Sequence, residues 1–552
     1  MSIFFSNPPW WEGKESRKGW FKRKRWRRGI RAGSRWPFTS LNKSRPDKRH
    51  IKDYTPYPYF LGYATTYAQR KIGKNHVFFR DSIGLSESYK SYFNFLDTIK
   101  NKIEYFLLES ATPSWEHDYK LIKEIKSKYP HFKIIIAGSI GSVPEKLQNC
   151  KEIHAILKGE YEKNTLKVLN GEKGIIDHDL LTLDEMNQSP TPYFDDLHFD
   201  KYFDWNPVPM SKYFPQAHIW GSRGCPFKCI FCVWPASMTG NDPDGDKKRT
   251  VRQYTKEYMK NFIGTLIEKY KYQTIYFDDD TFNIGNKHTV DMCEIMNEFK
   301  IPWFAMCRAD SIRKETWKIM YDSGCQGVKI GVESGSQYVV DKIVNKHLDL
   351  NYTKEIVQYI KSLGMSVHGT FTYGLPGETK ESFINGVKEL IDSGTGRLII
   401  YTLMMLYGTK FKDPNYRNQF GYKVKYRIIP LNFGEYENQR IFDYEEAGVS
   451  TKDMSFDDYL WSRGLSLIIE TLHNNRPFAS LFRYSEEINI KPTDLLLRLY
   501  ESIDRAPRAA KELMQGFMEE TVNELWESEE ELVKFYRKDE NYEKLLRGEV
   551  GG

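Results

Sequence analysis

Residues 221–232 read Gly-Ser-Arg-Gly-Cys-Pro-Phe-Lys-Cys-Ile-Phe-Cys and place Cys225, Cys229 and Cys232 in a C-x3-C-x2-C array. A [4Fe–4S] cluster normally takes four cysteines, so a loop that supplies three would leave one iron open to a small molecule. The two glycines allow the backbone to wrap closely around a ligand, and Phe231 gives the loop an apolar side. The stretch therefore predicts an iron–sulfur cluster with a reactive open iron.

A zinc loop is the alternative, because thiolates at short spacing also bind zinc, usually as two C-x2-C pairs with four ligands in total. The chain has seven cysteines, and the other four, Cys150, Cys293, Cys307 and Cys325, are scattered singly. Single cysteines are more often small buried apolar residues than ligands. We therefore expect the metal ligands to come from this one loop.

The array resembles the cluster motif of the radical S-adenosylmethionine (SAM) enzymes. The resemblance implies that the amino and carboxylate groups of SAM bind the open iron. It also implies that one electron from the cluster cleaves SAM to methionine and a 5′-deoxyadenosyl radical. The expected scaffold is a partial β/α barrel, with the site at the C-terminal ends of its strands as in complete barrels.

The length and composition of the chain indicate a large protein of a reducing compartment. Its 552 residues are enough for two to four domains, and irregularly spaced cysteines argue against a disulfide framework. No apolar run approaches the length of about 18 residues that a membrane helix needs. The start does not resemble a signal peptide, because the positive charges follow the apolar residues. We expect a soluble, cytoplasmic protein.

The net charge of +7 is concentrated near the N-terminus, where Lys and Arg crowd residues 14–35 among Trp20, Phe21, Trp26 and Trp36. A basic, aromatic arm can grip phosphates and stack on bases. It can equally lie along the protein's own surface or cover the anionic groups of a cofactor. No RNA-binding module is visible elsewhere, and a basic patch alone reports only electrostatics. Nucleic acid is therefore not the expected partner.

Residues 1–170 alternate apolar runs with amphipathic stretches, which is the pattern of a parallel sheet wrapped by helices. Strands are expected at residues 2–6, 76–80, 105–109, 133–137 and 155–158. A turn-rich tip follows each strand, and ligands of open α/β sheets bind at the carboxyl ends of the strands. A doubly wound domain without a cofactor is the simpler alternative.

The order and content of these tips resemble the cobalamin-binding, flavodoxin-like domain of the B12-dependent branch of the radical SAM family. The resemblance implies cobalamin contacts from Asn7, Pro8, Thr112, Ser114, Gly138, Ser139, Gly159 and Glu160. The D-x-H-x-x-G sequence, which supplies a histidine below the cobalt in other cobalamin proteins, is absent. Its nearest fragment, residues 196–198, lacks the glycine. We therefore expect cobalamin to bind without a histidine ligand, as in many radical SAM relatives.

Three further regions complete the expected organisation. Residues 171–215 form a connector, because prolines at 190, 192, 207, 209 and 215 interrupt any helix. Residues 216–406 form the radical SAM barrel, with strands at residues 218–221, 274–277, 303–306, 327–332, 366–373 and 397–402. Tyr254, Tyr258, Phe262 and Leu266 recur at helical spacing and predict the core face of the first barrel helix. Residues 407–552 are expected to be mainly helical and to shape the substrate pocket.

Several ends of the barrel strands carry groups that the resemblance assigns to SAM. The SAM contacts implied are Phe231, Asp278, Asp279, Arg308, Glu333, Ser334, Gly374 and Pro376. Carboxylates suit the SAM ammonium group electrostatically, but the acidic run at 278–280 can also cap the next helix. Arg308 can pair with the SAM carboxylate as a bidentate donor or form a structural salt bridge. No catalytic residue is identified.

Together these features predict a cobalamin-dependent radical SAM enzyme that methylates an unactivated carbon. The resemblance implies that hydrogen abstraction by the 5′-deoxyadenosyl radical is followed by methyl transfer from methylcobalamin. The implied partners are a small-molecule or peptide substrate and an electron donor such as flavodoxin or ferredoxin. A radical cyclisation or rearrangement without methyl transfer is one alternative, and a non-catalytic scaffold is another. An RNA-modifying methylthiotransferase is disfavoured, because that family carries a second cluster on three N-terminal cysteines and residues 1–170 hold only Cys150.

Overall fold

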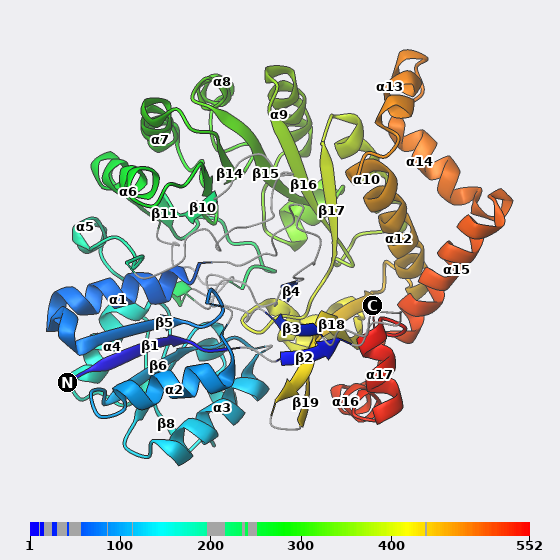
Figure 1. The fold of residues 1–552 in the computed structure, drawn as a ribbon. Helices are drawn as coiled ribbons and strands as arrows, with labels where there is room; N and C mark the ends of the chain where they lie inside the picture. The colour runs from blue at the N-terminus through cyan, green and yellow to red at the C-terminus, as the bar shows by residue number, and fades with distance from the viewer. Residues whose placement is uncertain are drawn as a thin grey trace.

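The computed structural model describes residues 1–9, 12–15, 25–29, 41–42, 57–85, 87–112, 114–195, 216–233, 238–240, 251–436 and 439–551. Figure 1 shows two parallel sheets with their helices and a helical C-terminal region at the far side of the second sheet. The fragment at 196–198, three of the five connector prolines and most of the basic aromatic arm lie outside the described residues.

The first sheet has six parallel strands in the order β5-β1-β6-β7-β8-β9. Their bounds are β1 Ile3–Asn7, β5 Val77–Asp81, β6 Tyr105–Glu109, β7 Lys133–Ala137, β8 Ile153–Leu157 and β9 Gly174–Ile176. The five strands predicted from the sequence are confirmed within two residues. Because β9 pairs with β8, the sheet extends past residue 170, where the connector was expected to begin.

Four helices cover the two faces of this sheet: α1 Tyr59–Ile72, α2 Tyr89–Ile99, α3 Trp115–Lys128 and α4 Tyr161–Leu169. Side chains alternate between the faces of a strand, and β1 follows this rule. Phe4 packs into the core under α2 and α3, whereas Ile3 and Phe5 face α1 and α4. The core under α1 and α4 is continuous with that of the second sheet, since Phe60 lies 4.8 Å from Trp220 between ring centroids.

The second sheet is the expected partial barrel, with six parallel strands in the order β10-β13-β14-β15-β16-β17. The strands are β10 Gln216–Ile219, β13 Thr274–Phe277, β14 Trp303–Cys307, β15 Cys325–Glu333, β16 Ser366–Tyr373 and β17 Arg397–Thr402. The helices α6 Lys256–Glu268, α7 Asn286–Phe299, α8 Lys314–Asp322, α9 Leu350–Leu363 and α10 Lys380–Asp392 lie along its outer side (Figure 1). All six predicted strands are confirmed.

One detail of the first barrel helix was predicted wrongly. Phe262 and Leu266 are buried on α6 as expected. Tyr254 precedes the helix, because Thr255 caps it by accepting a hydrogen bond from the backbone N–H of Tyr258. Tyr254 instead follows the short strand β12 Arg252–Gln253, which pairs antiparallel with β11 Ser222–Arg223 immediately before the cysteine loop.

The region after residue 406 contains a β-hairpin that was not predicted. Its long strands, β18 Lys423–Tyr436 and β19 Gln439–Ser450, pair with each other. Three short strands of the N-terminal arm, β2 Glu12–Glu15, β3 Arg25–Gly29 and β4 Leu41–Asn42, extend this sheet in the order β19-β18-β2-β3-β4. These segments of the basic arm therefore lie along the protein's own sheet.

The remaining helices confirm the helical character expected of the C-terminal region. They are α11 Pro414–Phe420, α12 Phe456–Ile468, α13 Ala479–Glu487, α14 Pro492–Glu501, α15 Arg508–Asn523, α16 Glu529–Tyr536 and α17 Asp539–Arg547. A short helix, α5 Leu183–Gln188, lies between the two parallel sheets in sequence. Among the described residues, none of the helices combines the length and apolar character needed to span a bilayer.

Candidate functional site

The cysteine loop is fixed against a turn at the mouth of the barrel. The backbone N–H of Ile230 donates to the carbonyl oxygen of Val344 at 3.1 Å, and the Asn345 amide donates to the carbonyl oxygen of Lys228 at 3.1 Å. Ile230 is buried in a small apolar cluster that includes Val344 and Leu375. The loop that carries the thiols is therefore attached to the barrel by both backbone and side-chain contacts.

Cys225, Cys229 and Cys232 are half-buried and form no disulfides. In the described part of the chain, no three His, Cys, Asp or Glu side chains converge on a point where one ion could sit. Burial, with a smaller contribution from Asp280, raises the pKa of the Cys225 thiol to about 11. A thiolate there needs a cationic partner, which iron would supply.

Asp279 holds the start of the cysteine loop. One of its carboxylate oxygens accepts the Gly221 backbone N–H at 3.0 Å and the other accepts the Ser222 hydroxyl at 2.5 Å. Asp278 is also buried, with a carboxylate oxygen 3.9 Å from Nδ1 of His218. Both acids lie directly after β13, as the strand prediction implied. The contacts of Asp279 are those of a residue that shapes the loop.

Arg308 also faces the cysteine loop. Of the two roles considered from the sequence, it forms the structural salt bridge. Its guanidinium binds Asp310 at 2.5 and 2.9 Å and donates to the carbonyl oxygens of Lys346 and His347. The same group lies 3.9 Å from the centroid of the Phe227 ring. Arg308 therefore connects β14 to the turn after β15 and to the loop itself.

Glu333 ends β15 in an unusual backbone conformation. Its φ is +75°, and the pairing of β15 with β16 shifts register between Gly331 and Glu333. Non-glycine residues with positive φ and β-bulges both concentrate at functional sites. The Glu333 carboxylate accepts from Lys346 Nζ at 3.0 Å and from the hydroxyls of Thr370 and Thr372 at 3.4 and 3.1 Å. The carboxylate of this strained residue is thus held by three donors at the carboxyl end of β15.

Ser334 and the turn at 374–377 lie beside Glu333. The Ser334 hydroxyl donates to the Glu378 carboxyl at 2.6 Å, and burial raises the pKa of Glu378 to about 8. Gly374 has a φ of +89°, and its carbonyl oxygen accepts from the Tyr422 hydroxyl at 2.8 Å. Pro376 lies in the same buried turn. Phe231 of the cysteine loop is half-buried, and Lys346 Nζ lies 5.8 Å from its ring centroid.

The tips of the first sheet bring together the residues expected to contact cobalamin. Asn7, followed by the buried Pro8, donates to Asp81 at 2.7 Å across the ends of β1 and β5. At the tip of β6, the hydroxyls of Ser110 and Ser114 both donate to one oxygen of Asp118, at 2.5 and 2.8 Å. These hydrogen bonds fix the loops at the sheet edge.

The tip of β7 offers polar groups that the described residues leave unused. The hydroxyls of Ser139 and Ser142 are buried and have no hydrogen-bond partner in the described structure. Buried polar groups without a partner are uncommon, so these two fit a polar ligand at the sheet edge. Gly138 precedes them with a φ of +101°, and a Cβ there would overlap the carbonyl oxygen of Ser110. The glycine lets the tips of β6 and β7 approach each other.

Gly159 and Glu160 have a different environment from the other tips. Gly159 has a φ of +79°, and a Cβ on it would lie 2.8 Å from the carbonyl oxygen of Met238, beyond the cysteine loop. The Glu160 carboxylate is buried and binds Arg252 at 2.6 and 3.0 Å. Glu160 also lies 3.4 Å from Arg223, so this tip contacts the chain both before and after the cysteine loop.

An open pocket lies between the two parallel sheets and the hairpin. Thr112 and Trp115 contribute from the β6 tip, residues 404–407 from the segment after β17, and β18 and β19 from the hairpin. Its walls carry both polar and apolar side chains, among them Tyr407, Phe442 and Glu446. The pocket therefore joins the tip of β6 in the first sheet to the segment that follows β17 in the second.

Sequence reasoning missed several buried polar residues around these groups. They are Arg223, Arg252, Glu162, Asn283, Lys346, Thr370 and Glu378, together with the half-buried Asn345 and Thr372. Arg223 lies within the cysteine stretch 221–232, and Glu162 lies in the tip that follows β8. Both are charged residues in segments that the sequence already marked as functional. Their partners are distant in sequence and become evident only in the fold.

Comparison with known proteins also points to a radical SAM domain. Residues 221–390 match the family described as the Radical SAM superfamily. The uncharacterized methyltransferase PH0819 of Pyrococcus horikoshii is 26% identical over 288 residues, which is 49% of this chain and 61% of that protein. The cobalamin-dependent radical SAM methyltransferase TokK of Streptomyces tokunonensis is 20% identical over 398 residues, covering 65% of this chain and 55% of TokK. The chain thus spans less than two thirds of these curated relatives.

A solved structure of the cobalamin-dependent SAM radical enzyme OxsB, with aqua-cobalamin and SAM bound, shares the fold. It superposes with a TM-score of 0.54 and 15% sequence identity over 90% of this chain and 78% of OxsB. The chain therefore carries a radical SAM domain, and its similarity to cobalamin-dependent radical SAM enzymes, expected from the sequence, is confirmed.

Proposed function

We propose that this protein is a cobalamin-dependent radical SAM methyltransferase that modifies an unactivated carbon. The observation that carries the proposal is the pocket that joins the first sheet to the second, lined from one side by Thr112 and Trp115 and from the other by residues 404–407 after β17. A methyl carrier on the first edge and a radical generator on the second would both reach a substrate held there. Positioning two reaction partners in one site removes much of the entropic barrier to their reaction.

The donor sets at the two edges suit the groups they would hold. Cys225, Cys229 and Cys232 would bind the cluster, and the Glu333 carboxylate lies at the barrel mouth, where a ribose or ammonium group of SAM would bind. The unused Ser139 hydroxyl would contact cobalamin at the first sheet. When bound, the cluster and SAM would supply a 5′-deoxyadenosyl radical, and cobalamin would carry the methyl group.

The remaining SAM and cobalamin contacts expected from the sequence divide into two kinds. Residues whose polar atoms are already used within the protein, such as Asp279, Arg308 and Glu160, would act by shaping the site. Residues at turns with positive φ, such as Gly138 and Gly374, would act by allowing a close approach of the backbone.

The pocket supports a small-molecule or short peptide substrate. Its acids are largely paired within the protein: Glu446 binds Arg417 at 2.8 and 2.9 Å, and Glu445 binds Arg427 at 2.5 Å. The aromatic ring of Tyr407 lies between residues of the two sheets, with Lys146 Nζ 4.3 Å from its centroid. The electron for SAM cleavage would come from a flavodoxin or ferredoxin.

Anaerobic reconstitution tests the proposal. The purified protein, supplied with iron, sulfide and hydroxocobalamin, should take up one cluster and one cobalamin per chain. With SAM and a reductant it should form 5′-deoxyadenosine at the cluster and S-adenosylhomocysteine through cobalamin. Failure to take up cobalamin would contradict the methyltransferase proposal, and a loaded protein that cleaves no SAM would be a scaffold.

A further inference from the structure

Two arginines stand directly opposite each other on the ribbon that leads into the cysteine loop. Arg223 of β11 is the register partner of Arg252 of β12. Their side chains are 4% and 9% exposed. Like charges placed opposite each other destabilise a strand pair, and burial without partners would add a large desolvation cost. The ribbon therefore requires nearby anions to be stable.

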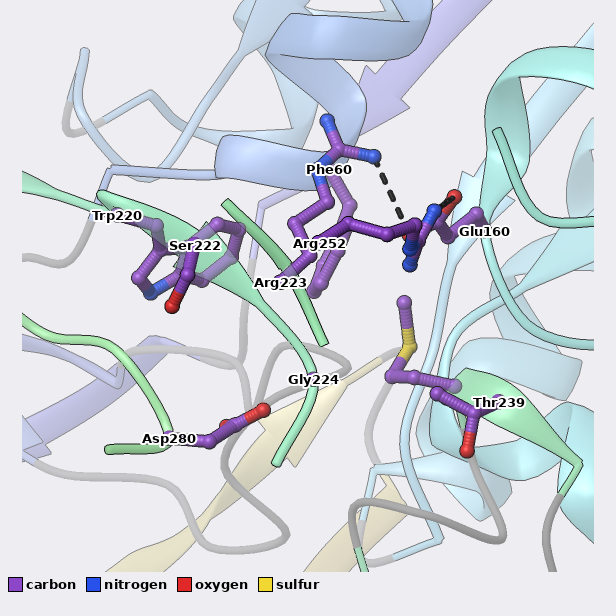
Figure 2. A pocket seen from close by; sticks show the side chains of 10 residues that line it. Phe60, Glu160, Trp220, Ser222, Arg223, Gly224, Thr239, Arg252 and Asp280 are labelled. Atoms are coloured by element: carbon purple, nitrogen blue, oxygen red, sulfur yellow. Dashed lines mark hydrogen bonds and ion pairs between the residues drawn. The ribbon is translucent and has the colours of Figure 1, made fainter. Parts of the chain in front are cut away.

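The first sheet supplies these anions from the tip after β8. Glu160 binds Arg252 at 2.6 Å and lies 3.4 Å from Arg223, and Glu162 lies 2.9 Å from Arg223. Figure 2 shows Arg252 and Glu160 joined beside Arg223 and Gly224. Although burial opposes ionisation, the two arginines hold the pKa of the Glu160 carboxyl below its usual range. Two cations from the barrel thus face two acids of the first sheet.

Aromatic rings and backbone groups close the quartet of Glu160, Glu162, Arg223 and Arg252 to solvent. The Arg223 guanidinium lies 4.7 Å from the centroid of the Tyr63 ring on α1, and its Nε donates to the Tyr254 hydroxyl at 3.1 Å. Leu181 contributes its backbone N–H to Glu160 at 3.0 Å. At this degree of burial an ion pair that loses one member leaves an uncompensated charge, which is strongly destabilising.

A second contact holds the other end of the cysteine loop to the same tip. The loop is followed by residues 238–240, where the carbonyl oxygen of Met238 lies against Gly159. Gly240 has a φ of +72°, and a Cβ on it would lie 2.8 Å from Nδ1 of His178. The loop with its three thiols therefore leaves and returns to the edge of the first sheet.

We propose that the quartet of Glu160, Glu162, Arg223 and Arg252 is a positioning device that fixes the cluster loop relative to the edge of the first sheet. Arg223 lies two residues before Cys225, and Glu160 follows Gly159 at the expected cobalamin edge. The device rests on the proposed function, since its purpose is to set the distance between the radical generator and the methyl carrier. Glu160 accordingly acts through the two arginines and not by contact with a cofactor.

The test compares two Glu–Arg pairs of similar geometry, each with a buried glutamate. Glu160→Gln and Arg252→Gln each break the quartet. The control is Glu87→Gln, because Glu87 is also buried and binds Arg80 at 2.6 and 2.8 Å, but entirely within the first sheet and its helices. Hydrogen–deuterium exchange of the peptide spanning residues 221–233 is measured in the full-length protein without cofactors.

Both quartet variants should raise exchange in residues 221–233 by at least about tenfold, because each leaves a buried charge without its partner. Glu87→Gln should lower overall stability without this local effect. Unchanged exchange at the loop in both quartet variants would overturn the proposal.

A second readout separates positioning from simple structural support. In the reconstituted variants, the ratio of S-adenosylhomocysteine to 5′-deoxyadenosine should shift by about tenfold from that of the wild-type protein, whereas Glu87→Gln should keep the wild-type ratio. Arg252→Lys, which retains the charge but not the bidentate geometry, should bring the ratio part of the way back to the wild-type value. If exchange rises while the ratio stays constant, the quartet is a structural contact and the positioning role is refuted. If wild-type protein takes up no cobalamin, the methyltransferase proposal fails, while the exchange result still reports on the quartet.

Discussion

Replacing Gly138 by alanine should disrupt the first sheet at the edge where cobalamin is proposed to bind. Gly138 joins β7 to the turn that carries Ser139, with φ +101° and ψ −173°, a region of backbone space that is essentially restricted to glycine. A Cβ there would lie 3.0 Å from the backbone nitrogen of Ser110 and closer still to its carbonyl oxygen. Both obstacles are backbone atoms, so neither can rotate away.

The expected cost has two parts. Holding a non-glycine residue in this conformation costs about 1–3 kcal/mol, and forcing an extra methyl group into a packed site costs about 1–3 kcal/mol more. Gly171→Ala is the matched control, because Gly171 has a similar φ of +108° but no atom within 4 Å of the position that an added Cβ would take. The control should show the backbone cost alone, so the two variants should differ by about 1–3 kcal/mol.

Urea unfolding followed by circular dichroism measures this difference, and titration with hydroxocobalamin measures its effect on the sheet edge. Gly138→Ala should be the less stable variant and should lose cobalamin uptake, while Gly171→Ala should take up cobalamin as the wild type does. Equal stability of the two variants would refute the argument that the β6 and β7 tips approach too closely for a side chain. Normal cobalamin uptake by Gly138→Ala would mean that cobalamin does not bind at this edge.

Three further predictions concern the second sheet. Replacing Cys225, Cys229 and Cys232 together by alanine should abolish both the visible absorption of the reconstituted cluster and the cleavage of SAM. Cys293→Ala, which changes a buried cysteine on α7, should retain both. A full cluster in the triple variant would refute the ligand assignment. Asp279→Asn should reduce the stability of the loop by about 1.5–3 kcal/mol, because the carboxylate accepts two hydrogen bonds at the loop start. It should also lower the iron content per chain, whereas Asp322→Asn, at an exposed salt bridge, should not. Equal iron content in the two variants would contradict the role of Asp279. The raised pKa of Glu378, about 8 in the folded protein against an ordinary value of 4.5, means that the folded state keeps a proton that the unfolded state has released between these pH values. The free energy of unfolding should therefore fall as pH rises from about 5 to about 8, and Glu378→Gln should remove that part of the pH dependence in urea titrations; an identical pH slope in both proteins would refute the assignment.

Much of the fold followed from the sequence because both parallel sheets are buried on their two faces. Such strands appear as short continuous apolar runs bounded by turns, and β6, β7, β13, β16 and β17 were predicted at their observed bounds. The hairpin of β18 and β19 was missed although residues 423–428 alternate basic and apolar side chains, as a strand does. Its pairing with β2 joins opposite ends of the chain, and no local pattern reports that contact.

The site was predictable where one short segment carries the chemistry. The thiols of the cysteine loop and the polar residues after each strand follow from local spacing and from the rule that parallel strands end at a common edge. The helical spacing that included Tyr254 was misleading, because Tyr254 packs on Arg223 before α6 begins. The pairing of Glu160 with Arg252 joins residues 92 positions apart, and no local pattern reports such a contact.

The most direct test of the central claim follows the methyl group of SAM. The reconstituted protein is incubated without oxygen with methyl-labelled SAM, cobalamin, a reductant and an extract of small molecules from its own cells, and the products are separated by mass. Methyl transfer from cobalamin predicts a labelled product with one added methyl group, formed together with equal amounts of 5′-deoxyadenosine and S-adenosylhomocysteine. A product of unchanged carbon count, formed with 5′-deoxyadenosine alone, would contradict methyl transfer and favour a radical cyclisation or rearrangement.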